Sequence, residues 1–175
     1  MMKPELAWIW EWENLSVKLK VAKNVADIFL HFRQDLGENE RGGQLFVDVN
    51  QSDGLWLSIA TLPNKKDRSG TNWLSLDQNR CKEEIKTANK QGLILVGYWH
   101  THPELIPNLS PQDIKSFREF SQKNSKYLSC PLAVIVGNGI ETNSIRAWSL
   151  QNNQFMLGLM KNRVGDFLSK HTSTS

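Results

Sequence analysis

Residues 93–123, LILVGYWHTHPELIPNLSPQDIKSFREFSQK, place a short apolar strand, a proline-rich loop and a helix one after another. The strand, at 93–99, lacks polar alternation, and we expect it to be buried on both faces in the middle of a sheet. Three prolines between 103 and 111 exclude regular structure there. The segment 110–123 then begins like a helix, with Ser at the cap and Pro at the first position.

The rest of the chain surrounds this unit with alternating strands and helices. Trp8, Trp10 and Trp12 recur with period two, which predicts a strand with three tryptophans on its core face. Alternating elements mixed with hairpins predict a single α/β domain, residues 1–175, with a mixed β-sheet flanked by helices. The expected strands lie at 8–12, 15–19, 44–49, 55–62, 73–76, 132–136, 144–149 and 154–160, the last of which could instead begin a helix, and the expected helices at 21–36 and from Asp77 to about Lys90.

The composition limits the classes of protein that this chain can belong to. Its 175 residues are 39% hydrophobic and 22% charged, as in an ordinary globular domain, and a net charge of +3 does not argue for nucleic-acid binding. The N-terminus has no signal-peptide pattern, and no run is long and apolar enough to span a membrane. Two separate cysteines predict a reduced, cytoplasmic protein. The polar tail from Ser169 is expected to fray.

The chemistry concentrates around two histidines at the end of the buried strand. His100 and His102 lie two residues apart, so both imidazoles point to the same side, and neutral imidazole is a favoured zinc ligand. Asp113, on the first turn of the next helix, can supply a third ligand if the loop turns back. Three protein ligands leave one open position, the pattern of a catalytic zinc site. Ser110 and Asp113 also fit an ordinary helix cap, so each residue alone is ambiguous.

A hydrolytic zinc site also needs a general base. Glu40 is one candidate, because it precedes Gly42 and Gly43 at the mouth of a strand, and glycines allow the backbone to approach a partner closely. Glu38 and Glu104 are the competing candidates. The residues alone leave this choice open.

Three short runs together resemble the signature of the JAB/JAMM (MPN+) zinc metallopeptidases. The family pattern has an upstream Glu, then H-x-H-P, with Ser seven and Asp ten residues after that Pro. The stretches GYWHTHPE and TLPNKKDRSGTNW look like bacterial members of the family. The matching runs are Glu40-Arg41-Gly42-Gly43, His100-Thr101-His102-Pro103 and Ser110-Pro111-Gln112-Asp113.

The resemblance implies a fold, a reaction and a role for each residue. The family's fold is a mixed sheet between helices, of the JAB/MPN, cytidine-deaminase-like type. His100, His102 and Asp113 would bind one zinc ion, Glu40 would act as general base and then as acid toward the leaving amine, and Ser110 would hydrogen-bond the developing oxyanion. The family cleaves peptide or isopeptide bonds after the C-terminal glycine of ubiquitin or ubiquitin-like proteins.

The resemblance to bacterial members suggests a subgroup within the family and a region that contacts the substrate. The chain looks like the stand-alone peptidase of CBASS anti-phage operons, which deconjugates proteins attached to a cGAS-like nucleotidyltransferase (CD-NTase). A basic loop at 63–72 could contact an acidic partner through Lys65, Lys66 and Arg68, and an exposed strand edge near 55–72 could hold the partner's extended tail.

Two other functions are compatible with parts of the pattern. A metal-free MPN-type scaffold would share the fold, although the intact motif argues against it. A zinc nucleobase deaminase would use H-x-E, which His102-Pro103-Glu104 fits, but it also needs P-C-x-x-C, and Cys130 has no partner cysteine. The H-E-x-x-H motif of other zinc peptidases is absent from the sequence.

Overall fold

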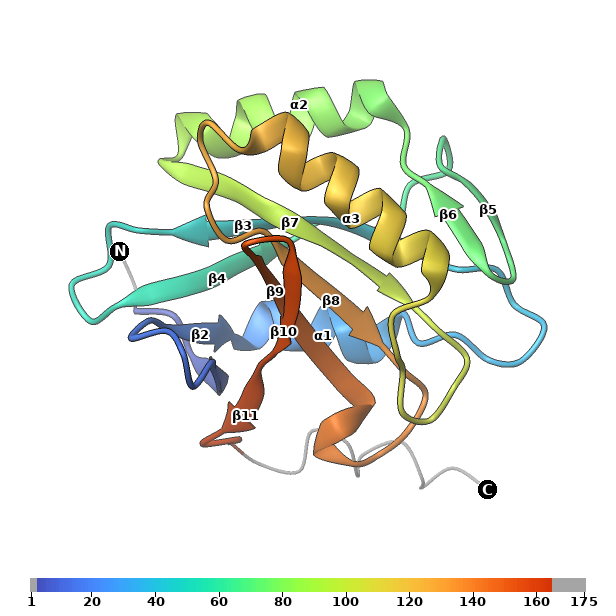
Figure 1. The fold of residues 1–175 in the computed structure, drawn as a ribbon, viewed down its shortest axis with the longest axis horizontal. Helices are drawn as coiled ribbons and strands as arrows, with labels where there is room; N and C mark the ends of the chain where they lie inside the picture. Colours follow the sequence, from blue (N-terminus) through green and yellow to red (C-terminus); the bar gives the residue numbers. More distant parts are fainter. Residues whose placement is uncertain (1–2, 165–175) are drawn as a thin grey trace.

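A mixed sheet forms the centre of the protein (Figure 1). The structure is a computed structural model that describes residues 3–164, so the polar tail from Ser169 lies outside the described residues. Within 3–164, nine strands form the sheet in the order β10-β9-β8-β7-β3-β4-β2-β1-β11. They are β1 (Leu6–Glu11), β2 (Lys18–Ala22), β3 (Gly42–Asp48), β4 (Leu55–Ala60), β7 (Leu93–Thr101), β8 (Leu132–Val136), β9 (Ile145–Gln151), β10 (Gln154–Leu157) and β11 (Leu159–Lys161).

The remaining elements are a small hairpin and the helices. Strands β5 and β6 pair only with each other, in antiparallel register. In the sheet, β2 with β4 and β7 with β8 are parallel pairs, and the other neighbours are antiparallel. This mixed sheet with helices on its faces confirms the predicted fold class. The bounds are β5 (Arg68–Gly70), β6 (Trp73–Ser75), α1 (Lys23–His31), α2 (Gln78–Lys90), α3 (Pro111–Asn124) and the short 3₁₀ helix η1 (Thr142–Ser144).

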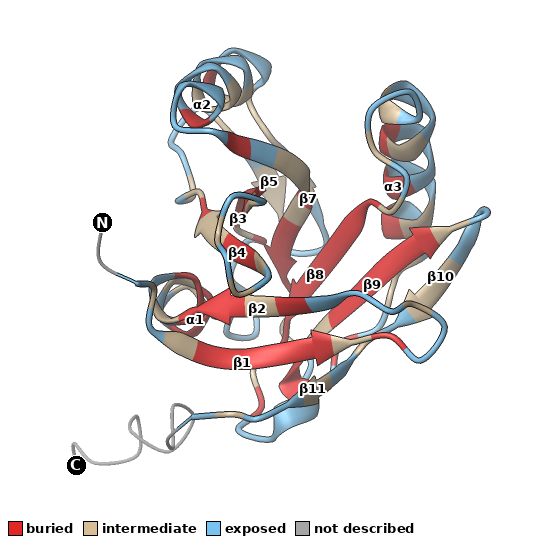
Figure 2. Cartoon of the chain, turned by 90° about the vertical axis from the view of Figure 1, so that its left-hand side faces the viewer, coloured by how far each residue is buried: buried red, intermediate tan, exposed pale blue. Residues whose placement is uncertain are grey.

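The sheet curls around α1, and the main core lies on this inner face. Its two edge strands, β10 and β11, are separated in sequence only by Gly158, so the two edges of the sheet must approach each other. Figure 2 shows α1 enclosed by β1 and β2 with buried residues along the strands. Trp8 and Trp10 pack edge to face at 5.6 Å, and Trp12 is also buried, which confirms the predicted tryptophan face.

Helices α2 and α3 cover the opposite face of the sheet, above β7 (Figures 1 and 2). Asp77 caps α2 as predicted, because its side chain accepts a hydrogen bond from the Arg80 amide. Phe117 and Phe120 of α3 pack on the sheet together with Ala133 and Ile135. No helix within residues 3–164 is long and apolar enough to cross a membrane.

Several elements differ from the sequence-based expectations. Helix α1 ends at His31 and not at residue 36, because the chain turns to bury Gln34, whose side chain bonds backbone carbonyls of two other segments. The expected loop at 63–72 contains β5 and leads into β6. The buried pair of Asp67 and Arg80 holds that segment against α2, and such a long-range contact is invisible to local patterns.

Two further expectations concern individual strands. Strand β7 lies in the middle of the sheet as predicted, but Ile94 is 46% exposed, so its first half is not buried on both faces. Strand β4 lies between β2 and β3, so the expected exposed edge near residues 55–60 does not exist. The edge that remains in that region belongs to the β5–β6 hairpin.

Candidate metal centre

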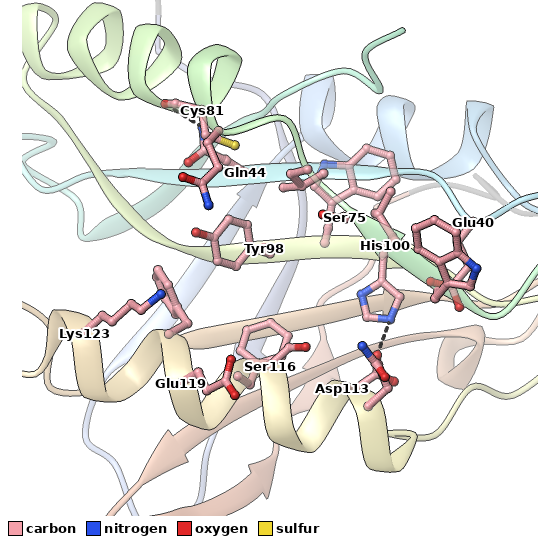
Figure 3. A pocket seen from close by; sticks show the side chains of 18 of the residues that line it. Glu40, Gln44, Ser75, Cys81, Tyr98, His100, Asp113, Ser116, Glu119 and Lys123 are labelled. Carbon is pink, nitrogen blue, oxygen red and sulfur yellow. Dashed lines mark hydrogen bonds and ion pairs between the residues drawn. The ribbon is translucent and has the colours of Figure 1, made fainter. Parts of the chain in front are cut away.

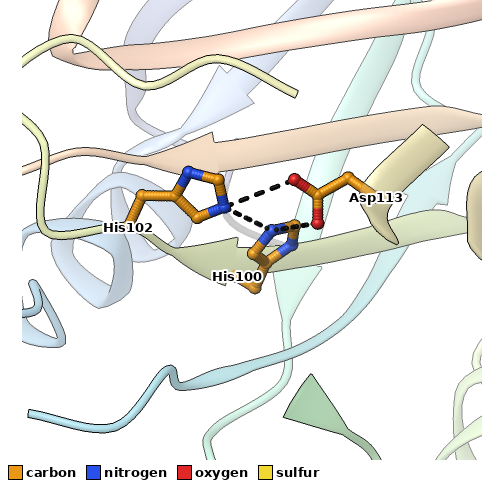
Figure 4. A group of neighbouring side chains, drawn as sticks. All are labelled: His100, His102 and Asp113. Carbon is orange, nitrogen blue, oxygen red and sulfur yellow. Dashed lines mark hydrogen bonds and ion pairs between the residues drawn. The ribbon is translucent and has the colours of Figure 1, made fainter. Parts of the chain in front are cut away.

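Two histidine side chains converge where β7 ends (Figure 4). His100 is the next-to-last residue of β7, and His102 follows the strand by one residue, so the period of two places both imidazoles on the side of α3. Both residues are buried, and their Nε2 atoms lie 3.1 Å apart. Two buried ring nitrogens held this close can bind one ion between them.

The first turn of α3 brings Asp113 to the same point. Asp113 Oδ1 lies 3.0 Å from His100 Nε2, and Oδ2 lies 3.3 Å from His102 Nε2. The same carboxylate belongs to a capping box, since Ser110 Oγ accepts from the Asp113 amide and Asp113 Oδ2 accepts from the Ser110 amide. The helix cap therefore orients the carboxylate toward the histidines. A role of Asp113 in the cap is thus compatible with a role as metal ligand.

The spacing of these donor atoms fits a small tetrahedral metal ion. Zinc lies about 2.0–2.2 Å from N and O ligands, which places neighbouring ligands of a tetrahedron about 3.3 Å apart. The two Nε2 atoms are 3.1 Å apart, Asp113 Oδ1 lies 3.0 Å from that of His100, and Asp113 Oδ2 lies 3.3 Å from that of His102. One donor atom from each of the three residues lies within 4.8 Å of the other two. All three residues are buried, and within residues 3–164 they form the one cluster of His, Cys, Asp and Glu with this geometry. The group can therefore hold a metal.

Charge interactions in this cluster shift the pKa values of its members. Burial raises the pKa of Asp113, but hydrogen bonds from His100 and His102 outweigh it and hold the pKa well below its ordinary value. Burial lowers the pKa of His102, whereas the hydrogen bond and charge of Asp113 raise it by more. The site thus favours the ionised form of the Asp113 carboxylate, which is the form that binds a metal.

Glu40 enters the site from the strand opposite. The β3–β7 ladder ends with the pair of Gly42 and His100, and Glu40 lies two residues before Gly42, in the segment that leads into β3. Glu40 is buried, its Oε1 lies 3.9 Å from His102 Nε2, and burial raises the pKa of its carboxyl group. A Cβ on Gly42 would lie 2.2 Å from the Trp99 carbonyl oxygen, so glycine is required here, as the sequence suggested.

The two competing acids do not share the side of the cluster on which the Nε2 atoms lie. Glu38 is exposed and pairs with Arg41. Glu104 is also exposed, and its Oε2 lies 3.4 Å from the far ring nitrogen of His102, Nδ1. A carboxylate at that nitrogen is typical of the second partner of a metal-binding histidine. Glu40 is therefore the acid that shares the enclosed side of the site with the donor atoms.

A groove of about 460 Å³ leads away from the cluster between α2 and α3 (Figure 3). His100, Asp113 and Glu40 line one end of it, and Tyr98 lies on its floor, two residues before His100 and on the same face. The groove was not predicted from the sequence, although the period of two along the strand places Tyr98 on the same face as His100. Most of the other lining residues come from β6, α2 and α3, among them Leu74, Cys81, Phe117, Phe120 and Lys123.

The predicted basic loop lies outside this groove. Lys65, Lys66 and Arg68 are exposed, and none of them lines it. Strand β6 does line the groove, from Trp73 to Ser75, and in the described part of the chain its one strand partner is β5. The edge that faces the site is thus the edge of β6.

Comparisons with known proteins concern the family and the fold of the chain. The family model described as prokaryotic homologs of the JAB domain matches residues 22–151. Among solved structures that match is the solution structure of protein DSY2949 from Desulfitobacterium hafniense, with a TM-score of 0.54 and 20% sequence identity, covering 78% of this chain and 87% of that chain. At that identity the likeness concerns the fold alone. No curated protein matches the chain.

Proposed function

The chain belongs to the prokaryotic homologs of the JAB domain, and from this premise we propose that it is a zinc-dependent peptidase. The observation that carries the proposal is the triangle of donor atoms from His100, His102 and Asp113, with Glu40 beside it. Three protein ligands and an adjacent acid are the parts of a hydrolytic zinc site. A structural zinc site would use four ligands, usually with cysteine.

The reaction divides between the metal and the chain's own residues. Zinc, when bound, would supply Lewis acidity toward a carbonyl group and lower the pKa of water. Glu40 takes the proton from the attacking water and returns it to the leaving amine. A raised pKa suits both steps, because the group must accept and release a proton near neutral pH.

Ser110 has a second role beyond the cap. Its Oγ accepts from the Asp113 amide, and within the described residues it donates no hydrogen bond. Its hydroxyl hydrogen is therefore available to stabilise negative charge on the substrate carbonyl oxygen. This assignment follows the family motif and is part of the proposal.

The groove indicates the shape of the substrate. An extended segment that lies between α2 and α3 would reach the metal centre at one end and run along the edge of β6. Strand addition to that edge would hold it through backbone hydrogen bonds, with little dependence on side chains. We propose as substrate the C-terminal tail of a ubiquitin-like protein, in an isopeptide, linear or processing bond. A role in anti-phage defence, with a CD-NTase as partner, stays a prediction from the sequence.

Zinc content separates the peptidase from a metal-free scaffold. We expect about one zinc per chain in the wild type and in Glu40→Gln, and a marked loss in Asp113→Asn. Ser110→Ala is the matched control, because it weakens the same helix cap, by about 1 kcal/mol, and leaves the metal-binding carboxylate in place. Zinc content is measured by elemental analysis after reconstitution and gel filtration.

Turnover tests the role of Glu40. With a library of fluorogenic peptidyl amides and ubiquitin-like fusions, we expect Glu40→Gln to lower kcat about 10²–10⁴-fold while zinc stays bound. A wild-type chain that binds no zinc when zinc is offered would make the protein a binding scaffold. A fully active Glu40→Gln would assign the base to another residue.

A further inference from the structure

Thr101 lies between the two metal-binding histidines but points to the other face of the sheet. Because side chains alternate along β7, Thr101 faces the α1 side, where it is completely buried. Its Oγ1 accepts a hydrogen bond from the Arg41 amide at 3.0 Å and donates one to Gln34 Oε1 at 3.0 Å. A single hydroxyl thus joins β7 to the segment that carries Glu40.

This hydroxyl completes the β3–β7 ladder at the point where the strands separate. One step beyond the pair of Gly42 and His100, Thr101 donates its amide to the Arg41 carbonyl at 2.9 Å. The return bond from the Arg41 amide goes to the Thr101 hydroxyl and not to a backbone carbonyl. The next amide, that of His102, donates to the carbonyl of Val136 in β8, the neighbour on the other side of β7.

Gln34 holds the other side of the same segment. It is completely buried, and its Nε2 donates to the Glu38 carbonyl at 2.8 Å and to the Thr71 carbonyl at 3.0 Å. The residue before Thr71 is Gly70, whose carbonyl accepts the amide of Glu40 at 2.8 Å. Hydrogen bonds therefore fix the backbone of this segment at the Glu38 carbonyl, the Glu40 amide and the Arg41 amide.

We infer that Gln34 and Thr101 are positioning residues that hold the Glu40 carboxylate against the metal centre from the rear of the sheet. Neither residue lines the groove, so neither can touch a substrate there, and both act through the backbone of residues 38–41. Their effect on turnover rests on the proposed function, whereas their effect on the backbone does not. A displacement of about 1 Å at a catalytic group can cost about a hundredfold in rate.

The test compares Thr101→Val, which keeps the shape and loses the hydroxyl, with Thr101→Ser, which keeps the hydroxyl. Ser149→Ala is the control, because it removes a buried β9 hydroxyl that has no hydrogen bond within the described residues. Hydrogen exchange by NMR on the zinc-loaded full chain should show the Arg41 and Glu40 amides exchanging about tenfold faster in Thr101→Val, but not in Thr101→Ser or Ser149→Ala. Gln34→Met should reproduce this result, and if it fails to fold, the Thr101 pair decides.

Kinetics and zinc content complete the experiment. We expect kcat to fall about 10–100-fold in Thr101→Val, with KM and zinc content unchanged, and to return in Thr101→Ser. Unchanged exchange at Arg41, or faster exchange spread equally over β9, would overturn the inference, because the hydroxyl would then have no local role. A zinc-loaded wild type that cleaves nothing would count against the proposed function, and the exchange result would still decide the positioning role.

Discussion

The ion pair of Asp67 and Arg80 gives the sharpest prediction about stability. Their side chains are 6% and 5% exposed, and the carboxylate bonds the guanidinium through Nη2 at 2.7 Å and Nε at 3.0 Å. It also accepts the amides of Asn64 and Asp77. Asp67→Ala therefore leaves a buried cation and two backbone donors without this acceptor.

The expected loss of unfolding free energy in Asp67→Ala depends on the interactions that Arg80 keeps. Breaking a buried pair from one side costs about 3–5 kcal/mol. Glu84 still neutralises Arg80 in the variant, so we expect the lower end, about 3 kcal/mol. For a chain of this size that corresponds to a fall in Tm of about 6–12 °C.

The assay is urea unfolding followed by tryptophan fluorescence, at fixed zinc and again with chelator, because bound metal stabilises the folded state. Asp27→Ala is the matched control. It removes the acid of an exposed pair with Lys23, and we expect Tm to change by less than about 1 °C. The double variant Asp67→Leu/Arg80→Met should recover the part of the loss that comes from the unpaired cation, while the two backbone donors stay without this acceptor. If Asp67→Ala is as mild as Asp27→Ala, the hairpin is not held by this pair.

Three other outcomes follow from the same structure. The pKa of Asp67 is lowered, because its bonds to Arg80 and two amides outweigh the effect of burial. The pair therefore stabilises the protein above the ordinary Asp pKa, and this contribution is lost as the pH falls. The difference in unfolding free energy between wild type and Asp67→Asn should shrink from about pH 5 to about pH 3. Gly42→Ala should destabilise the fold by about 1–3 kcal/mol and lower zinc affinity in a chelator competition, because its Cβ would overlap the Trp99 carbonyl and Leu74; normal stability would contradict the tight approach. Burial raises the pKa of the Cys81 thiol to about 11, so its alkylation by iodoacetamide at pH 8 should be slow and should accelerate toward pH 10, and rapid labelling at pH 8 would contradict its burial.

The metal cluster was predictable because its signals are local. His100 and His102 share a face by strand periodicity, and Asp113 stands at a helix start marked by its own cap. Local patterns also placed α2 and α3 within one residue of their observed ends. These features depend on neighbours in sequence, which a single chain reveals.

The environment of the cluster was not predictable, because it depends on distant contacts. No pattern in the sequence around Gln34 predicts that its amide is buried against residues 38 and 71, because glutamine is usually exposed. Likewise, a basic polar run such as 63–72 resembles a loop until Arg80 is known to lie over it. The exposure of Lys65, Lys66 and Arg68 leaves their suggested partner contact a prediction.

The double use of Asp113, as helix cap and as donor to the cluster, would make the wall of the groove responsive to a bound metal. An ion held by this carboxylate is tied to the first turn of α3, and α3 is one side of the channel that a substrate would occupy. With a metal bound there, metal occupancy and the width of the groove would be thermodynamically linked. By reciprocity, a segment that binds better when the start of α3 is held in place must increase the affinity of the chain for its metal by the same factor.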